Sequence, residues 1–224
     1  SRILDETESA LATMEKLARD IRDTSPQTAD RLDETTGMAR DDALTGELGA
    51  ARDKLGACEF DGALKHGRRA LDTMNRMSGA LDSMRQQFNA EMTARAKSMI
   101  RAVLRKTLDI SEAHEAVVNR TERLLDHRSS KMTELLKPAM YEEQIAREAA
   151  AALAEDAARL AAFSMAVPSH APALAAEAAA SLSAAIEHFA EGDHGRALYE
   201  QRNASLRLNQ LALALLDAQK RASM

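Results

Sequence analysis

The stretch from residue 80 to residue 137 contains neither proline nor glycine. These two residues are the strongest local interrupters of a helix, so their absence over this length favours one or two long helices. Apolar side chains recur in the stretch at the three-, four- and seven-residue steps of one helix face, and two polar residues fall in the same series. The series is Met92, Met99, Val103, Ile110, His114, Val117, Thr121 and Leu124.

The composition excludes a large β-sheet. Four Phe, two Tyr and no Trp make up 3% of the chain, and nine Gly with four Pro are too few for a loop-rich all-β protein. Hydrophobic residues make up 45% and charged residues 29%, which suits a folded chain. A single cysteine, Cys58, excludes a disulfide framework and a cysteine-based metal site. No apolar run approaches the length that spans a membrane. The sequence therefore predicts an all-α protein.

We expect an elongated helical bundle of about seven helices. Helices are predicted over about 3–24, 27–57, 131–137, 139–163 and 173–190, with one or two long helices over 60–126 and a last helix after the turn at 191–195. Glycine weakens a helix, so the second helix is expected to break near Gly37 or Gly46, and Pro138 is expected to separate two helices. The predicted organisation is a three-helix unit over residues 1–95, a connecting helix over 96–137 and a second three-helix unit over 138–224.

The chain contains a candidate internal repeat. Residues 55–84 align without gaps to residues 189–218, a shift of 134 positions, and in both copies a turn is followed by a long helix. The matched pairs are Ala63-Leu64 with Ala197-Leu198, Arg68 with Arg202, Ala70 with Ala204 and Asn75 with Asn209. Two Ala/Leu heptads can also align by chance, and that alternative stays open. The inward series of the last helix includes Gln201.

No arrangement of reactive side chains indicates an enzyme. A carboxylate-bridged metal pair in a helical bundle uses Glu-x-x-His motifs on two helices, whereas the six histidines show this spacing only at Glu191-x-x-His194, across the turn at 191–195. The sequence also lacks the glycine-rich phosphate and dinucleotide motifs, the serine-nucleophile elbow and the cysteine pair of haem attachment. The sequence thus predicts a non-enzymatic protein with no catalytic residue, metal or cofactor, and it identifies no small-molecule substrate.

A basic run is the one candidate interaction surface in the sequence. It comprises Arg95, Lys97, Arg101, Arg105 and Lys106, with no acid among them. Together with the apolar residues of the Met-rich segment 92–108, the run forms a basic amphipathic helix that could lie on an anionic membrane surface. A solvated helix face is the simpler interpretation. The net charge of −5 and the lack of stacking aromatics argue against nucleic-acid binding.

The chain resembles a family of long, uncharacterised bacterial proteins that have N-terminal transmembrane helices and a helical, low-complexity C-terminal region, a domain of unknown function. The resemblance covers most of residues 99–219 and, more weakly, 45–84. Its motifs begin with Leu104 to Leu125, which include Ile110-Ser111 and Glu115, followed by Ala149–Phe163, Phe163-x-x-x-x-Pro168 and an alanine-rich helix. They end with Gly192-Asp193, Ala197-Leu198, Gln201-Arg202, Ala204, Leu208-Asn209, Ala212 and Leu215-Leu216. The first copy has Lys65-His66-Gly67 where the second has Tyr199-Glu200-Gln201.

This resemblance implies a bacterial cell-envelope setting, as part of a larger membrane-anchored protein, and no chemistry. We therefore expect a non-enzymatic helical scaffold or protein-interaction module that binds a protein partner or associates with itself through helix faces. The alternative is a bundle that senses a ligand or a membrane surface through the basic helix 92–108.

Overall fold

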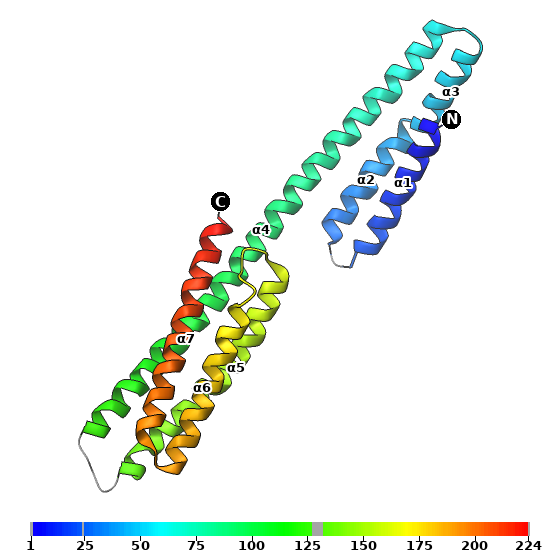
Figure 1. Cartoon of the computed structure of the whole chain (residues 1–224). Helices are drawn as coiled ribbons and strands as arrows, with labels where there is room; N and C mark the ends of the chain where they lie inside the picture. The colour runs from blue at the N-terminus through cyan, green and yellow to red at the C-terminus, as the bar shows by residue number, and fades with distance from the viewer. Residues whose placement is uncertain (1, 24, 127–131, 224) are drawn as a thin grey trace. The chain divides into compact units, whose positions relative to one another are not determined.

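The computed structural model describes residues 2–23, 25–126 and 132–223, and every regular element in these ranges is an α-helix (Figure 1). The prediction of an all-α bundle is confirmed, and seven helices are present in this part of the chain. They are α1 (Arg2–Ile21), α2 (Pro26–Asp41), α3 (Leu44–Gly56), α4 (Phe60–Asp126), α5 (Met132–Phe163), α6 (Ala171–Glu191) and α7 (His194–Arg221).

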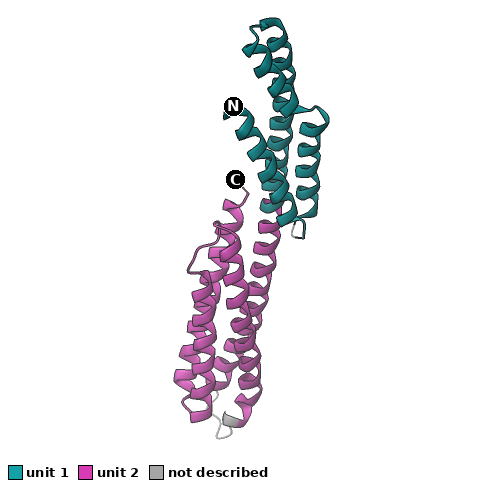
Figure 2. Ribbon diagram, turned by 90° about the vertical axis from the view of Figure 1, so that its right-hand side faces the viewer, with its two compact units in different colours: residues 1–92 teal, residues 93–224 magenta. Residues whose placement is uncertain are grey.

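The chain divides into two compact units, Ser1–Met92 and Thr93–Met224, called unit 1 and unit 2 (Figure 2). The boundary lies three residues before the end of the predicted first unit. The segment 96–137, predicted as a connector, is not a separate element, because Ile100, Val103 and Leu104 of α4 are buried in the largest core cluster of unit 2. Unit 2 is consequently a four-helix bundle rather than a three-helix one.

Unit 1 consists of α1, α2, α3 and the first half of α4. Its core is two small clusters, one around Leu44, Ala70 and Met77 and the other around Ala18, Leu32 and Met84. Exposed ion pairs join the same helices, for example Arg40 with Glu15 and Arg22 with Asp33. Alanine buries little area, so each cluster depends on a few Leu and Met side chains.

The break between α2 and α3 lies at Asp42 and Ala43, three residues before Gly46, so a break occurs near that glycine as expected, but the glycine does not cause it. Ala43 has a left-handed backbone with φ of 48°. The carboxylate of Asp42 accepts a hydrogen bond from the Thr73 hydroxyl at 2.9 Å and another from Arg76. Leu44, which follows Ala43 and begins α3, is buried. The contacts of Asp42 and Leu44 therefore position the turn, and both glycines continue a helix.

Unit 2 packs the second half of α4 against α5, α6 and α7, which run side by side (Figure 2). Helix α6 contacts its neighbours through alanines spaced three or four residues apart, and Ala171, Ala175 and Ala178 are fully buried. Small side chains on one helix stripe allow two helix axes to approach closely, so the bundle is narrow. Larger side chains on α7, including Leu208, Leu211 and Leu215, fill the space that remains.

Pro138 lies inside α5 and does not separate two helices, contrary to the prediction. Proline removes one backbone hydrogen bond and costs about 3 kcal/mol in a helix interior. The residues on either side offset that cost, because Leu136 and Ala139 are buried and Leu136 packs in a cluster with Phe189 and Ala197. The other predicted break, at 126–130, agrees with the end of α4 at Asp126, and residues 127–131 lie outside the described ranges.

Helix α4 is continuous across residues 60–126, which answers a question that the sequence left open. Residues 85–91 of this helix are exposed one after another. Among the described helices, none has an apolar stretch of the length and purity that would cross a bilayer.

Candidate functional site

The basic run does not form a single surface in the structure. Arg95 and Lys106 are eleven residues apart, which is three helical turns, and both contact α5. The Arg95 guanidinium lies 5.3 Å from the centre of the Phe163 ring, and the Lys106 ammonium donates to Asp156 at 2.6 Å. The hydrogen bonds from Lys106 and from Arg159 hold the pKa of the Asp156 carboxyl below its usual value.

The other three cations of the run lie on a different side of α4. Lys97, Arg101 and Arg105 follow one another at four-residue steps, so they share one stripe of the helix. Leu108 is in register with this stripe and is 48% exposed. The predicted five-residue surface is therefore a three-residue surface, with the remaining two residues held by α5.

A groove between α3 and α4 is an exposed apolar feature of unit 1. Four large side chains line it, and each is more than half exposed: Leu55, Phe60, Leu64 and Leu71. Ala51, Asp61, Ala63, Gly67 and Arg68 complete the lining, and its volume is about 570 Å³. Phe60, Leu64, Gly67 and Leu71 follow the four-three-four spacing by which one helix packs on another. We call this feature the α3–α4 groove.

The repeat alignment relates the α3–α4 groove to a covered face of unit 2. At the shift of 134, Gly67 and Arg68 correspond to Gln201 and Arg202 of α7. Helix α4 covers Gln201, whose carbonyl accepts from His114 at 2.9 Å, and it pairs with the exposed Arg202, whose guanidinium donates to Glu122 at 2.8 Å. Among the described residues of unit 1, no helix lies at the equivalent place. A Cβ atom placed on Gly67 would meet nothing within 4 Å, and Arg68 is exposed.

A buried polar cluster occupies the core of unit 2, where three helices meet. His114 and Thr121 come from α4, Glu143 from α5 and Gln201 from α7, and all four are at most 1% exposed. The Gln201 amide donates to the Glu143 carboxyl and, at 3.4 Å, to the Thr121 hydroxyl. A buried polar group without partners is costly, so these contacts select one register of the three helices.

The protonation state of His114 follows from its contacts. Its Nε2 atom lies 2.9 Å from the Gln201 carbonyl oxygen, which can only accept, so Nε2 bears the proton and Nδ1 of the neutral ring is an acceptor. Burial lowers the pKa of His114, while the bond to the Gln201 backbone and the charge of Glu115 oppose that shift. The imidazole is therefore neutral at pH 7.

Glu143 has the opposite shift. Burial raises the pKa of its carboxyl to about 7, the hydrogen bond from Gln201 opposes the rise, and the nearby charge of Glu142 adds to it. Glu143 Oε2 lies 3.4 Å from His114 Nδ1, within ion-pair range, yet neither atom has a hydrogen bond among the described residues. When Glu143 is ionised, two acceptors face each other without a donor.

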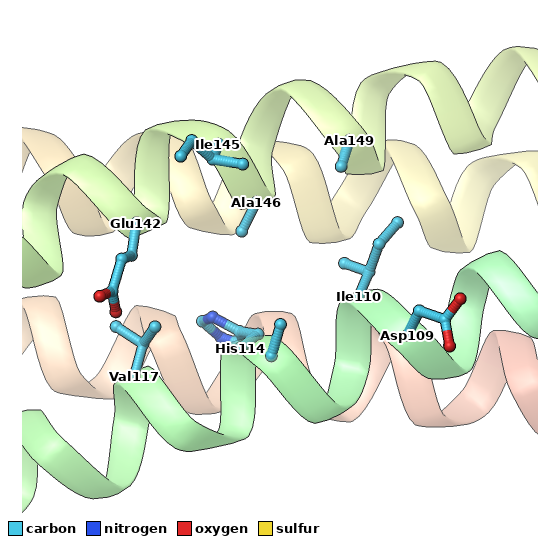
Figure 3. A pocket seen from close by; sticks show the side chains of 9 residues that line it. Asp109, Ile110, His114, Val117, Glu142, Ile145, Ala146 and Ala149 are labelled. Atoms are coloured by element: carbon cyan, nitrogen blue, oxygen red, sulfur yellow. The ribbon is translucent and has the colours of Figure 1, made fainter.

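A pocket opens next to this cluster, between α4 and α5 (Figure 3). Its volume is about 310 Å³, and its walls are mostly apolar side chains. The imidazole of His114 lies between the two helices at the pocket, with Glu142 on the opposing helix (Figure 3). The pocket is lined by Asp109, Ile110, Ala113, His114, Val117, Glu142, Ile145, Ala146 and Ala149.

Sequence periodicity places His114, Thr121 and Gln201 on inward faces, and the structure brings all three together. Polar residues at core positions of a heptad are the signal for such a cluster. Glu143 has no such signal, because it adjoins Glu142 in a charged stretch of α5. Among the described residues, no group of three or more His, Cys, Asp and Glu side chains is arranged to hold a metal ion.

Comparison with known proteins does not add a relative. No protein-family model matches the chain, and searches of curated proteins and of solved structures found no significant match. The resemblance to the membrane-anchored bacterial family therefore stays a prediction, and the functional argument depends on the geometry.

Proposed function

We propose that the chain is a non-enzymatic helical interaction module that associates with a second copy of itself through the α3–α4 groove. The supporting observation is the uncovered stripe Phe60, Leu64, Gly67 and Leu71, in which Gly67 corresponds to Gln201 of α7, a residue buried against α4. Each large side chain of this stripe leaves more than half of its surface in water. Burying such side chains against another helix is favourable by about 25 cal/mol per Å² of apolar area.

The charges beside the stripe favour a second copy as the occupant. Asp61 and Arg68 are seven residues apart, so they lie on the same side of α4, and neither makes an ion pair among the described residues. In an antiparallel pair of α4 helices centred between Leu64 and Gly67, Phe60 lies opposite Leu71 of the second copy. Asp61 and Arg68 of the second copy are then offset by two residues, about 3 Å along the axis. Two-fold symmetry forms this ion pair twice.

Small and large residues alternate in the same register. Leu64 lies opposite Gly67 of the second copy, where no atom obstructs the approach within 4 Å of a Cβ position. A large side chain facing a glycine is a packing that lets two helices approach closely. The stripe is therefore self-complementary in both shape and charge.

Sedimentation velocity over a concentration series tests this proposal. The wild-type chain is expected to shift from monomer to dimer, and Leu64→Glu is expected to stay monomeric, because it buries two unpaired carboxylates in the seam. Leu213→Glu is the matched control, since Leu213 is an exposed leucine of α7 in unit 2. A wild-type chain that is monomeric at every concentration, or an equal loss of dimer in both variants, would contradict the proposal.

A charge exchange tests the register. Asp61→Arg places like charges together and should weaken the dimer, while the double variant Asp61→Arg with Arg68→Asp restores opposite charges and should recover it. If the double variant is as weak as the single one, the antiparallel register is wrong even where a dimer forms.

A second candidate function is binding to an anionic membrane surface, the alternative read from the basic run. The observation that favours it is the stripe Lys97, Arg101 and Arg105 with the exposed Leu108 in register. Flotation with phosphatidylserine vesicles tests it, and the triple substitution of the three cations by Glu should abolish binding. Lys106→Glu is the control, because Lys106 already pairs with Asp156. Equal flotation of the triple variant and wild type would eliminate this candidate.

A further inference from the structure

We propose that the pocket between α4 and α5 of unit 2 binds a small primary amine with an apolar body, its ammonium group at His114. This inference is independent of the α3–α4 groove, because the pocket lies in the other unit and involves none of the groove's residues.

The polar side chains at the pocket all accept hydrogen bonds. The lining contains three of them, Asp109, His114 and Glu142, and no cationic side chain. The free ring nitrogen of His114 is an acceptor because Nε2 donates to the Gln201 carbonyl. Carboxylates can only accept when ionised. A ligand that fits must therefore bring donors, which excludes a fatty acid or another anion.

When Glu143 is ionised, the buried pair beside the pocket lacks a donor, whereas the protonated carboxyl can itself donate to His114. His114 Nδ1 and Glu143 Oε2 are fully buried, lie 3.4 Å apart and have no hydrogen-bond partner among the described residues. An ammonium group has three donors and a positive charge, so one such group at His114 also offsets the charge of an ionised Glu143, which does not itself line the pocket. A hydroxyl has a single donor and no charge.

The charges at the mouth of the pocket also favour a cation. Asp109 is exposed and makes no ion pair among the described residues. Glu142 accepts two hydrogen bonds from Arg120, at 2.7 and 2.9 Å, so its charge is partly compensated. A bound ammonium ion would consequently interact more favourably with Asp109 than with Glu142.

The size and walls of the pocket define the rest of the ligand. A volume of about 310 Å³ lies at the lower end of the range for small-molecule sites. At about 30 Å³ of liquid volume per small group, it holds roughly ten non-hydrogen atoms. Ile110, Val117 and Ile145 supply apolar wall, so a chain or ring of about six carbons suits the space.

Hexylamine is the probe for the test, with hexanoate and hexanol as ligands of matched length. In two-dimensional NMR of the full chain, hexylamine is expected to shift the ring signals of His114 and the amides that line the pocket. Hexanoate is expected to cause no shift, and hexanol is expected to bind at least several-fold more weakly. Equal binding of hexanol or hexanoate would overturn the proposal, because the ammonium would then contribute nothing.

Two variants at exposed positions test the site without disturbing the core. Ala113→Trp fills the pocket from its mouth and should abolish the hexylamine shifts. Asp109→Asn should weaken hexylamine about two- to fivefold, as expected for an exposed ion pair. Glu112→Gln is the matched control, an exposed acid of α4 outside the lining. Unchanged hexylamine binding in Ala113→Trp would place the amine elsewhere and refute the site.

Discussion

Cys58 and Gly192 occupy the same position in two helix-ending turns, and they are separated by the 134 positions of the sequence repeat. Both have a left-handed backbone, with φ of 61° and 80°. In each turn the following residue donates its N–H back to the last turn of the helix: Glu59 to Lys54 at 2.8 Å and Asp193 to His188 at 2.9 Å. This is the Schellman arrangement, in which glycine is the preferred left-handed residue. The first copy keeps the geometry with a cysteine.

Replacing Cys58 by glycine is expected to stabilise unit 1 by about 1 kcal/mol, the usual penalty of a left-handed backbone for a residue with a Cβ atom. Urea unfolding followed by circular dichroism measures the difference. Cys58→Ala is the control, because it removes the sulfur but keeps the Cβ atom, and it should give little gain. An equal gain in both variants would mean that the thiol, and not the backbone, is the source of strain.

Glu143→Gln is expected to stabilise unit 2 above pH 7. The folded protein holds the Glu143 carboxyl protonated up to a pKa of about 7, whereas the ordinary value is 4.5. The folded state thus binds more protons than the unfolded state between these values, so its stability falls as pH rises through that window, by at most about 3 kcal/mol. Glutamine resembles the protonated carboxyl, and it can accept from Gln201 while donating to His114.

Urea midpoints at pH 5 and pH 8 check this expectation. The wild-type midpoint should fall between the two values more than that of Glu143→Gln. His114 acts in the opposite direction, since its lowered pKa removes stability as pH falls below 6.5, and both proteins share that loss. The matched control is Glu155→Gln, which removes an exposed acid of the same helix. Parallel pH profiles for wild type and Glu143→Gln would show that the buried carboxyl does not titrate in this range.

Pro138→Ala is expected to stabilise the protein by about 2 kcal/mol, because alanine restores a donor for a carbonyl in the first turns of α5. The gain is smaller than the full proline penalty, since proline also restricts the unfolded chain. Thermal unfolding measures it, and Lys137→Ala at the neighbouring exposed position should change little. Destabilisation by Pro138→Ala would contradict this expectation. It would mean that proline stabilises the start of α5 by more than its missing hydrogen bond costs.

Ala175→Leu is expected to destabilise unit 2 by about 1–3 kcal/mol through overpacking. Ala175 is fully buried in the stripe by which α6 packs closely on its neighbours. Ala176→Leu adds the same side chain one position along, where α6 is exposed, and should be nearly neutral. Equal unfolding midpoints for the two variants would show that the helices have room to separate.

The sequence was sufficient for the parts of the structure that depend on local pattern. The run without Pro and Gly predicted one or two long helices where α4 lies, and periodicity placed His114, Thr121 and Gln201 inward. It was misleading where a tertiary contact competes with propensity. Asp42 turns the chain because Thr73 and Arg76 bind its carboxylate, and Pro138 stays helical because its neighbours are buried. Neither contact partner can be read from a local window.

In the candidate sites, too, the sequence shows the local spacing of the residues but not their tertiary neighbours. The spacing of Phe60, Leu64 and Leu71 is visible in the sequence, but that this stripe lacks a neighbouring helix is not. The five cations of the basic run look equivalent until Asp156 and Phe163 of α5 take two of them. Glu143 belongs to the buried polar cluster because the fold places α4 and α7 beside α5, and the local sequence does not show this.

The exposed turns at residues 85–91 give α4 an uneven resistance to local opening. Amide hydrogens in the buried parts of the helix exchange with solvent only when packed side chains separate, whereas those in 85–91 are retained by the helix hydrogen bonds alone. Isolated helical turns of this composition are marginal in water. Deuterium should therefore enter the middle of α4 well before its two halves, and the longest helix of the protein should exchange as two separate blocks.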